Sequence, residues 1–110
     1  MSGFNTSWNT SSKTIKLKDV IRFMNKKRRR VYRFSARSLY KLLGRHLHTQ
    51  KSRIRRADIS VPIILVVDRA TRRPSVVLDG NHRLVKAASL GADIPFRVLY
   101  SDEYDMLFGS

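Results

Sequence analysis

The sequence predicts a small α/β or α+β domain in which one mixed sheet is flanked by helices, and three observations favour this class. The run from Val61 to Val67 is almost entirely apolar, which is typical of a buried strand. Strand-like and helix-like periodicities alternate along the chain. A chain of 110 residues, 42% of them apolar, is long enough for one hydrophobic core. We expect a single domain over residues 13–101, a disordered tail over 1–12 and an acidic tail over 102–110.

In the first half, the clearest element is an amphipathic helix over residues 35–48. Ser35 is a suitable N-cap, and an apolar stripe on the helix faces away from its cationic side chains. The other expected elements are less regular and are, in order, a short strand at 14–17, one or two helical turns at 20–24, an exposed basic loop at 26–30 and a basic connector at 49–57.

In the second half, strands and a helix alternate with turn-forming residues. Gly91 is a suitable C-terminal residue for the helix that precedes it. The acidic residues near the C-terminus could fold against basic surface and compete with nucleic acid. The expected elements, in order, are a strand at 61–67, a turn at 68–74, a strand at 75–78, a helix at 81–90 and a strand at 94–100.

Positive charge is concentrated in the first half of the chain. The formal net charge is +15, while residues 13–56 carry 17 Lys or Arg and one Asp, a net of +16. Residues 57–110 carry 6 basic and 7 acidic side chains, a net of −1. Such crowding of like charge destabilises a compact fold, and a polyanion relieves the repulsion. We therefore expect nucleic acid as the partner, whereas the plainer interpretation is a solvated face with counterions.

The candidate nucleic-acid contacts are basic side chains of the loop at 26–30, the helix at 35–48 and the connector at 49–57, together with Arg33. Tyr32 lies among arginines and is a candidate for stacking on a base. The chain has no cysteine, which excludes disulfides, thiolate metal sites and cysteine nucleophiles. No apolar run reaches the roughly 18–20 residues that cross a bilayer, so no membrane partner is expected. The candidate contacts are Lys26, Lys27, Arg28, Arg29, Arg30, Arg33, Arg37, Lys41, Arg45, Arg53, Arg55 and Arg56.

The clearest chemical pattern lies at Asp79 to Arg83, where a strand ends and a helix begins. Amides at a helix N-terminus bind anions, so Gly80 and Asn81 are candidate phosphate-binding positions. His82 could bind phosphate or transfer a proton, and the Arg83 guanidinium could bind phosphate oxygens. A carboxylate beside phosphate is repulsive unless a cation lies between them, so Asp79 suggests Mg²⁺ or Mn²⁺. Alternatively the turn is structural, with Asp79 as a helix cap and His82 and Arg83 as surface groups.

The second half resembles the ParB/sulfiredoxin superfamily, which includes the ParB-like nuclease domain, in the segment VVLDGNHRLVKAASLGADIPFRVL. Upstream, VPIILV is similar to the Pro-Ile strand of that family, and the resemblance covers residues 14–100, weakly before 35. The sulfiredoxin cysteine position is Asn81 here, which excludes reductase chemistry. Lys86 stands where relatives usually have a small residue, which adds a cation near the turn. The positions that match the superfamily motif are Asp79, Gly80, His82, Arg83, Ala87, Gly91, Ile94 and Pro95.

The resemblance implies a fold whose turn binds nucleotide, such as ATP or CTP, or nucleic-acid phosphate. In the leading hypothesis the protein binds DNA and hydrolyses phosphodiesters, with Asp79 holding a metal, Arg83 stabilising phosphate charge and His82 transferring a proton. One certain acidic ligand is few for a nuclease, so Asp58 or Asp68 would have to converge on the turn. The alternatives are a non-enzymatic nucleic-acid-binding module, a phage-type effector that blocks a host protein, or a nucleotide-dependent small-molecule kinase. The expected location is the cytoplasm of a bacterium or phage-infected cell.

Overall fold

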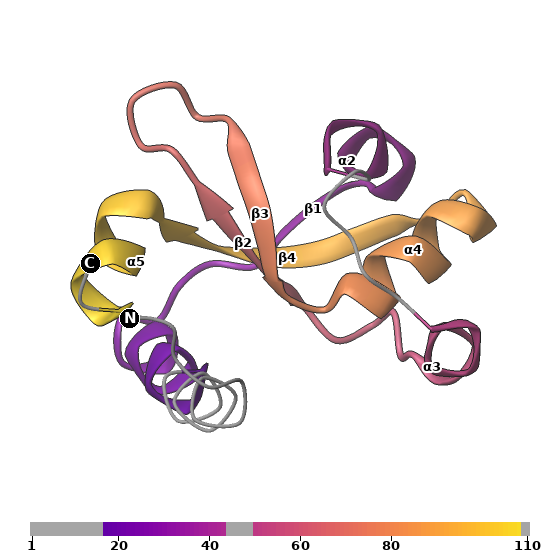
Figure 1. Ribbon diagram of the computed structural model, residues 1–110, viewed down its shortest axis with the longest axis horizontal. Coiled ribbons are helices and arrows are strands. Elements are labelled where there is room, and N and C mark those ends of the chain that lie inside the picture. Colours follow the sequence, from indigo (N-terminus) through magenta and orange to yellow (C-terminus); the bar gives the residue numbers. More distant parts are fainter. Residues whose placement is uncertain (1–16, 44–49, 109–110) are drawn as a thin grey trace, which may run out of the picture.

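A four-stranded mixed sheet organises the fold, with helices on both of its faces (Figure 1). The computed structural model describes residues 17–43 and 50–108. The expected tail at 1–12, most of the expected strand at 14–17 and Arg45 lie outside the described residues. Residues 17–26 form a helix, which is not labelled in Figure 1. The labelled elements are β1 (Tyr32–Ser35), α2 (Ala36–Leu43), α3 (Lys51–Arg56), β2 (Ile63–Val67), β3 (Pro74–Asp79), α4 (Asn81–Leu90), β4 (Asp93–Tyr100) and α5 (Ser101–Phe108).

The strand order is β1-β4-β2-β3, so the last strand of the chain lies between the first two. β2 pairs antiparallel with β3 through a hairpin, and α4 then carries the chain across the sheet to β4, which is parallel to β2. β1 adds to the far edge of β4 in antiparallel orientation. The expected α+β class and mixed sheet are therefore confirmed.

Strand β2 is buried along its whole length, which explains its unbroken apolar sequence. Successive side chains of a strand point to opposite faces of the sheet. Ile63, Leu65 and Val67 accordingly belong to one core cluster, while Ile64 and Val66 belong to the other. The central strand thus needs apolar residues at every position, because helices cover both of its faces.

Two hydrophobic clusters hold the layers together. The first joins one face of the sheet to α2 and α4, where Leu39 and Leu84 are 4% and 0% exposed. The second joins the other face to the helix at 17–26 and to α5, and it includes Val20 and Met24. In Figure 1 the helix at 17–26 and α5 lie to the left of the sheet, and α2, α3 and α4 lie to the right.

Local signals placed the helix termini well. Ser35 caps α2, because its Oγ accepts a hydrogen bond of 3.3 Å from the backbone amide of Ser38. Gly91 ends α4 in the left-handed conformation, at φ +67°, as its position in the sequence predicted. The exposed basic loop expected at 26–30 is correct in part, because Lys26 ends the helix at 17–26, Arg28 takes a positive φ of 52° and Arg29 is part-buried.

Two expectations for the outer segments were wrong, and one strand was not expected. Residues 49–57 were expected as a connector, but Lys51–Arg56 form α3, which packs beside α4. The helix at 17–26 extends beyond the expected one or two turns, because Val20 and Met24 are both buried against the sheet. Strand β1 was missed because it is a four-residue, mostly exposed edge strand whose pairing partner, β4, is far away in sequence.

The expected acidic tail is helix α5, whose apolar side chains join the second core cluster. Tyr104, Leu107 and Phe108 pack against that cluster at helical spacing. Asp102 and Glu103 lie in the first turn of α5, where negative charge favours a helix. Among the described residues, none of the helices is long and apolar enough to span a membrane.

Candidate functional site

The turn at residues 79–83 joins β3 to α4, as the sequence predicted. Gly80 is the N-cap of α4 and has φ +106°, a conformation that favours glycine. A Cβ atom at this position would lie 2.4 Å from Cγ2 of Ile63, well inside van der Waals contact. Close packing against the first residue of β2 therefore requires glycine here, whether or not phosphate binds.

Arg83 ties the start of α4 to the segment before β2. Its Nη1 atom donates to the carbonyls of Pro62 at 2.8 Å and of Val61 at 3.2 Å. Its Nη2 atom lies 3.2 Å from Oδ2 of Asp79, four residues earlier. Because the guanidinium already has three acceptors, Arg83 holds the turn in place and has few donors left for a ligand.

His82 and Asn81 contribute polar atoms that lack partners in the described part of the chain. The Nε2 atom of His82 and the Oδ1 atom of Asn81 are shielded from solvent, and neither atom takes part in a hydrogen bond with the described residues. Unsatisfied polar atoms of this kind are uncommon, because each costs roughly 1–3 kcal/mol. Of these two residues, only His82 is among those that line the neighbouring cleft.

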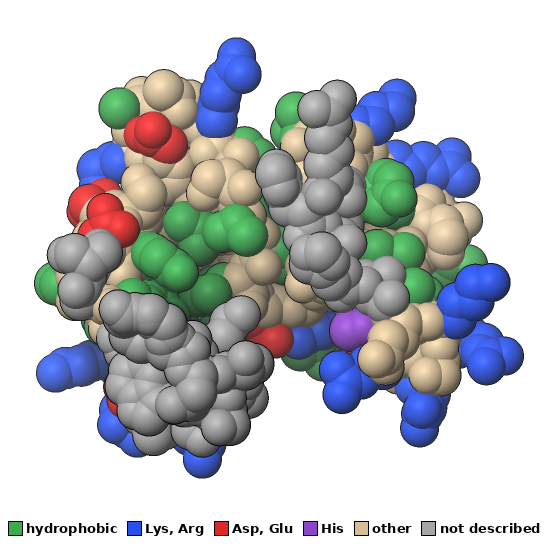
Figure 2. Space-filling model, viewed as in Figure 1, with side chains coloured by type: hydrophobic (Ala, Val, Ile, Leu, Met, Phe, Trp, Pro, Cys, Tyr) green, Lys and Arg blue, Asp and Glu red, His purple; other side chains and the backbone are tan. Residues whose placement is uncertain are grey.

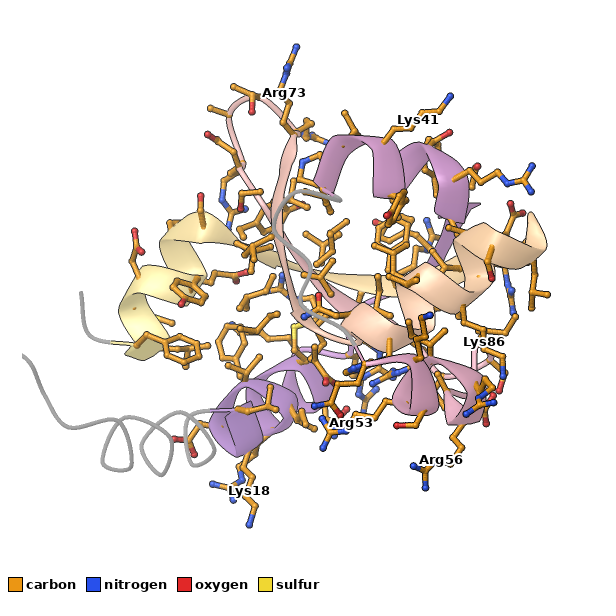
Figure 3. The ribbon with its side chains drawn as sticks, turned by 45° about the vertical axis from the view of Figure 1, so that its right-hand side comes forward. Lys18, Lys41, Arg53, Arg56, Arg73 and Lys86 are labelled. Atoms are coloured by element: carbon orange, nitrogen blue, oxygen red, sulfur yellow. The ribbon has the colours of Figure 1, made fainter. Side chains whose placement is uncertain are left out.

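An open cleft of about 720 Å³ connects this turn to α3. Arg53 and Arg56 reach it from α3, and His82 and Arg83 from α4. Arg53 and Arg56 are exposed, so their guanidinium groups are accessible to a ligand. Figure 3 places both arginines on the helix that runs beside the start of α4. The structure thus brings part of the expected basic connector together with the expected phosphate turn.

Lys86 positions α3 beside this cleft. Its Nζ atom donates to the carbonyls of Arg55 and Ala57, each at 2.8 Å. These carbonyls lie at the C-terminal end of α3, where a cation is favourable. The lysine that departs from the superfamily pattern therefore acts as a cap for α3.

Two carboxylates line the cleft, Asp58 and Asp79. Asp58 accepts hydrogen bonds from the amide and the hydroxyl of Ser60, at 3.0 and 2.6 Å, and these bonds lower its pKa. Asp68 lies away from the cleft, in the β2–β3 hairpin, where it accepts a bond from the amide of Ala70. Of the two acids that could have joined Asp79, only Asp58 does.

The described donors do not form a metal site by themselves. Residues 17–43 and 50–108 contain no group of three or more His, Asp or Glu side chains placed to hold an ion. Asp79, the expected metal ligand, is paired with Arg83. Mg²⁺ takes about six oxygen ligands, so phosphate and water would have to supply most of them.

The other candidate cations are spread around the molecule. In Figure 2 blue side chains project at several edges of the view, and in Figure 3 Lys41 projects from the top of the view, whereas Arg56 lies at the bottom. Arg29 is used within the fold, with two hydrogen bonds to Glu103, and Arg37 donates to the carbonyl of Ala88. Arg55 is exposed on α3 but is not among the residues that line the cleft. The exposed candidates elsewhere are Lys26, Lys27, Arg28, Arg30, Arg33 and Lys41.

Sequence reasoning did not anticipate the acceptors of Arg83 or the position of α3. The carbonyls of Val61 and Pro62 carry no side-chain signal, so only the fold reveals them. The arginines of α3 did leave a signal, because Arg53 and Arg56 are three residues apart and such spacing places side chains on one face of a helix.

Comparison with known proteins gives no match: no family model, curated protein or solved structure is similar to this chain. The evidence for the candidate site is therefore the geometry of its residues alone.

Proposed function

We propose that this protein is a ParB-like nucleic-acid-binding domain that holds phosphate groups in the cleft between α3 and α4. The observation that carries the proposal is the meeting of Arg53 and Arg56 with the N-terminus of α4 in one open cleft. An exposed guanidinium group can donate two parallel hydrogen bonds to the oxygens of one phosphate. Amides at a helix N-terminus add partial positive charge. His82 lines the same cleft, and its Nε2 atom has no hydrogen-bond partner among the described residues.

The overall charge supports a polymer rather than a small anion as the partner. The net charge of +15 far exceeds what one phosphate group needs. Each cation that neutralises a phosphate of the polymer releases counterions, which makes binding strong at low salt and weak at high salt. The exposed cations outside the cleft would add contacts that are independent of base sequence.

The test is a salt series of anisotropy titrations with a fluorescein-labelled DNA duplex. We expect the Arg53→Ala/Arg56→Ala variant to bind more weakly and to lower the slope of log K against log salt by about 2 units, since each contact contributes about 0.9. The matched control is Lys18→Ala/Arg22→Ala, which removes two exposed cations from the helix at 17–26. Equal losses in both variants would assign binding to total charge and not to the cleft. Absence of wild-type binding near physiological salt would refute the proposal.

The same cleft suits the phosphates of a mononucleotide. ATP and CTP are the candidates, and calorimetric titration of each against wild type and Arg53→Ala/Arg56→Ala tests them. We expect heat of binding that the double variant loses. If both proteins gave the same heats, nucleotide binding would have no connection with this cleft.

A second candidate function, metal-assisted phosphodiester hydrolysis, is favoured by the presence of Asp58, Asp79 and His82 along one cleft. The assay is conversion of supercoiled plasmid in the presence of Mg²⁺ or Mn²⁺. Asp79→Asn and His82→Ala should both abolish cleavage. Plasmid that stays intact over a range of divalent ions would leave the non-enzymatic binding module as the function.

A further inference from the structure

An apolar groove lies between α2 and the β2–β3 hairpin. Its volume is about 370 Å³, and Val67 at the end of β2 forms part of its floor. The α3–α4 cleft reaches Val61, just before the start of β2, so the two sites lie at opposite ends of this strand. The groove is lined chiefly by the apolar side chains Tyr32, Phe34, Leu42, Phe96, Val98 and Tyr100.

Large apolar side chains of this groove are open to solvent. Tyr32, Phe34 and Leu42 are 45%, 49% and 62% exposed. Tyr32 stacks on Phe96, with ring centroids 5.6 Å apart and an interplanar angle of 27°. An aromatic platform that is half exposed suits a flat ligand, because a ring can stack on it without rearranging the core.

Two arginines lie at the groove. The Arg30 guanidinium lies 5.9 Å from the centroid of the Tyr32 ring, and Arg72 belongs to the lining itself. Arg73 on the hairpin and Lys41 on α2 project outward from the two elements that flank the groove (Figure 3). The lining side chains that the structure describes include no Asp or Glu. A ligand that fits this site therefore combines a flat apolar body with negative charge outside it.

We propose that this groove binds unpaired bases of single-stranded nucleic acid. Phe34 and Tyr32 stack on the bases, while Arg30 and Arg72 contact the phosphates on either side. Aromatic platforms beside cations are the general means of binding single strands without sequence preference. Bases in a duplex stack on one another and are not free to enter, and an apolar peptide would leave these arginines unmatched. The inference depends on the proposed function, since it assumes a nucleic-acid partner.

The test compares an oligo-dT single strand with a duplex of equal length, both fluorescein-labelled, by anisotropy. Phe34→Ala and Tyr32→Ala should each weaken single-strand binding by about 5- to 100-fold and leave duplex binding within about 2-fold, the range expected for loss of one stacked base. The matched control is Tyr40→Ala, because Tyr40 is 44% exposed on α2 and lies outside the groove. Circular dichroism verifies that each variant folds.

A second measurement needs no variant. Irradiation of the wild type with a single strand that carries 5-iodouracil should cross-link Tyr32 or Phe34, as mapped by mass spectrometry. Suppose that the wild type binds duplex DNA. The groove proposal is then overturned if single-strand binding survives both the Tyr32→Ala and the Phe34→Ala substitution, or if Tyr40→Ala weakens single-strand binding as much as they do. If the wild type binds neither polymer, the proposed function fails as well, so the two failures are distinguishable.

Discussion

Replacing Glu103 by Gln should destabilise the fold, because this carboxylate connects α5 to the loop after the first described helix. Glu103 Oε1 accepts a bond of 2.9 Å from Nη1 of Arg29, and Oε2 pairs with Nη2. The amide of Tyr100 donates to the same Oε1 atom at 3.0 Å. The side chains of Glu103 and Arg29 are only 12% and 19% exposed. The pair is therefore largely shielded from water, and its loss is not compensated by solvent.

The expected cost follows from the number and type of bonds. Removing one partner of a fully buried ion pair costs roughly 3–5 kcal/mol, and this pair retains some contact with water. Because the amide oxygen of the substituted side chain can still accept one bond, we expect a loss of about 2 kcal/mol in the free energy of unfolding. For a domain of this size, that corresponds to a fall in Tm of about 10 °C, measurable by circular dichroism.

The pH dependence gives an independent check on the same pair. Burial alone would raise the pKa of Glu103, but the hydrogen bonds from Arg29 and the Tyr100 amide outweigh burial and lower it. A lowered pKa means that the stabilisation is complete above the unfolded value, about 4.3, and is lost as the pH falls through the folded value. The difference in stability between wild type and Glu103→Gln should therefore be constant near neutral pH and shrink below about pH 4.

Asp105→Asn is the matched control, because Asp105 is an exposed carboxylate on the same helix. We expect it to change Tm by less than about 2 °C. The argument would be refuted if both substitutions lowered Tm equally, or if the gap between wild type and Glu103→Gln persisted to pH 3.

Four further substitutions, one of them a control, test other parts of the fold by thermal or denaturant unfolding. Gly80→Ala should cost more than about 3 kcal/mol, since the methyl group meets Ile63 and the backbone has positive φ; a small loss would mean that β2 gives way easily. Lys86→Met should cost about 1–2 kcal/mol and speed amide exchange in α3, because the last carbonyls of α3 lose their donor; unchanged exchange would contradict the capping role. Leu84→Ala should cost about 2–5 kcal/mol at a fully buried site, whereas Leu90→Ala, at a 63% exposed site on the same helix, should cost well under 1; similar losses would contradict the assigned core.

The elements that the sequence predicted best are those with strong local signals. Strand β2 is apolar throughout because both of its faces are covered. Gly91 marks the end of α4. β1 and α5 were missed for a shared reason, since both are defined by distant contacts. β1 exists through its pairing with β4, and α5 through the packing of Tyr104 and Leu107 on the second core cluster.

In the candidate site, too, the features with a local sequence signal were predicted and those that depend on distant contacts were not. The sequence located the turn from Asp79 to Arg83, because a strand end followed by a helix start is a local pattern. It could not show that Arg83 bonds to carbonyls before β2, or that α3 lies across from the turn. Both facts depend on the β2–β3 hairpin, which brings residues about 20 positions apart into contact. Arg83 was expected either as a phosphate ligand or as a surface group, but it is a part-buried residue whose guanidinium holds the turn in place.

Some of the described cations stabilise the fold and others are free to bind a polyanion, and a change in salt concentration should affect the two groups differently. Arg29 and Arg83 bind acceptors within the fold, and their part-buried bonds are weakly screened by ions. Exposed cations such as Arg53 and Arg56, which both reach the α3–α4 cleft, repel each other in the free protein, so salt relieves that repulsion while it weakens contacts with a polyanion. Raising salt from about 50 to about 500 mM should therefore release bound nucleic acid while Tm of the free protein holds or rises. A fall in Tm parallel to the loss of binding would mean that exposed ion pairs, rather than the two apolar clusters and the shielded arginines, hold this domain together.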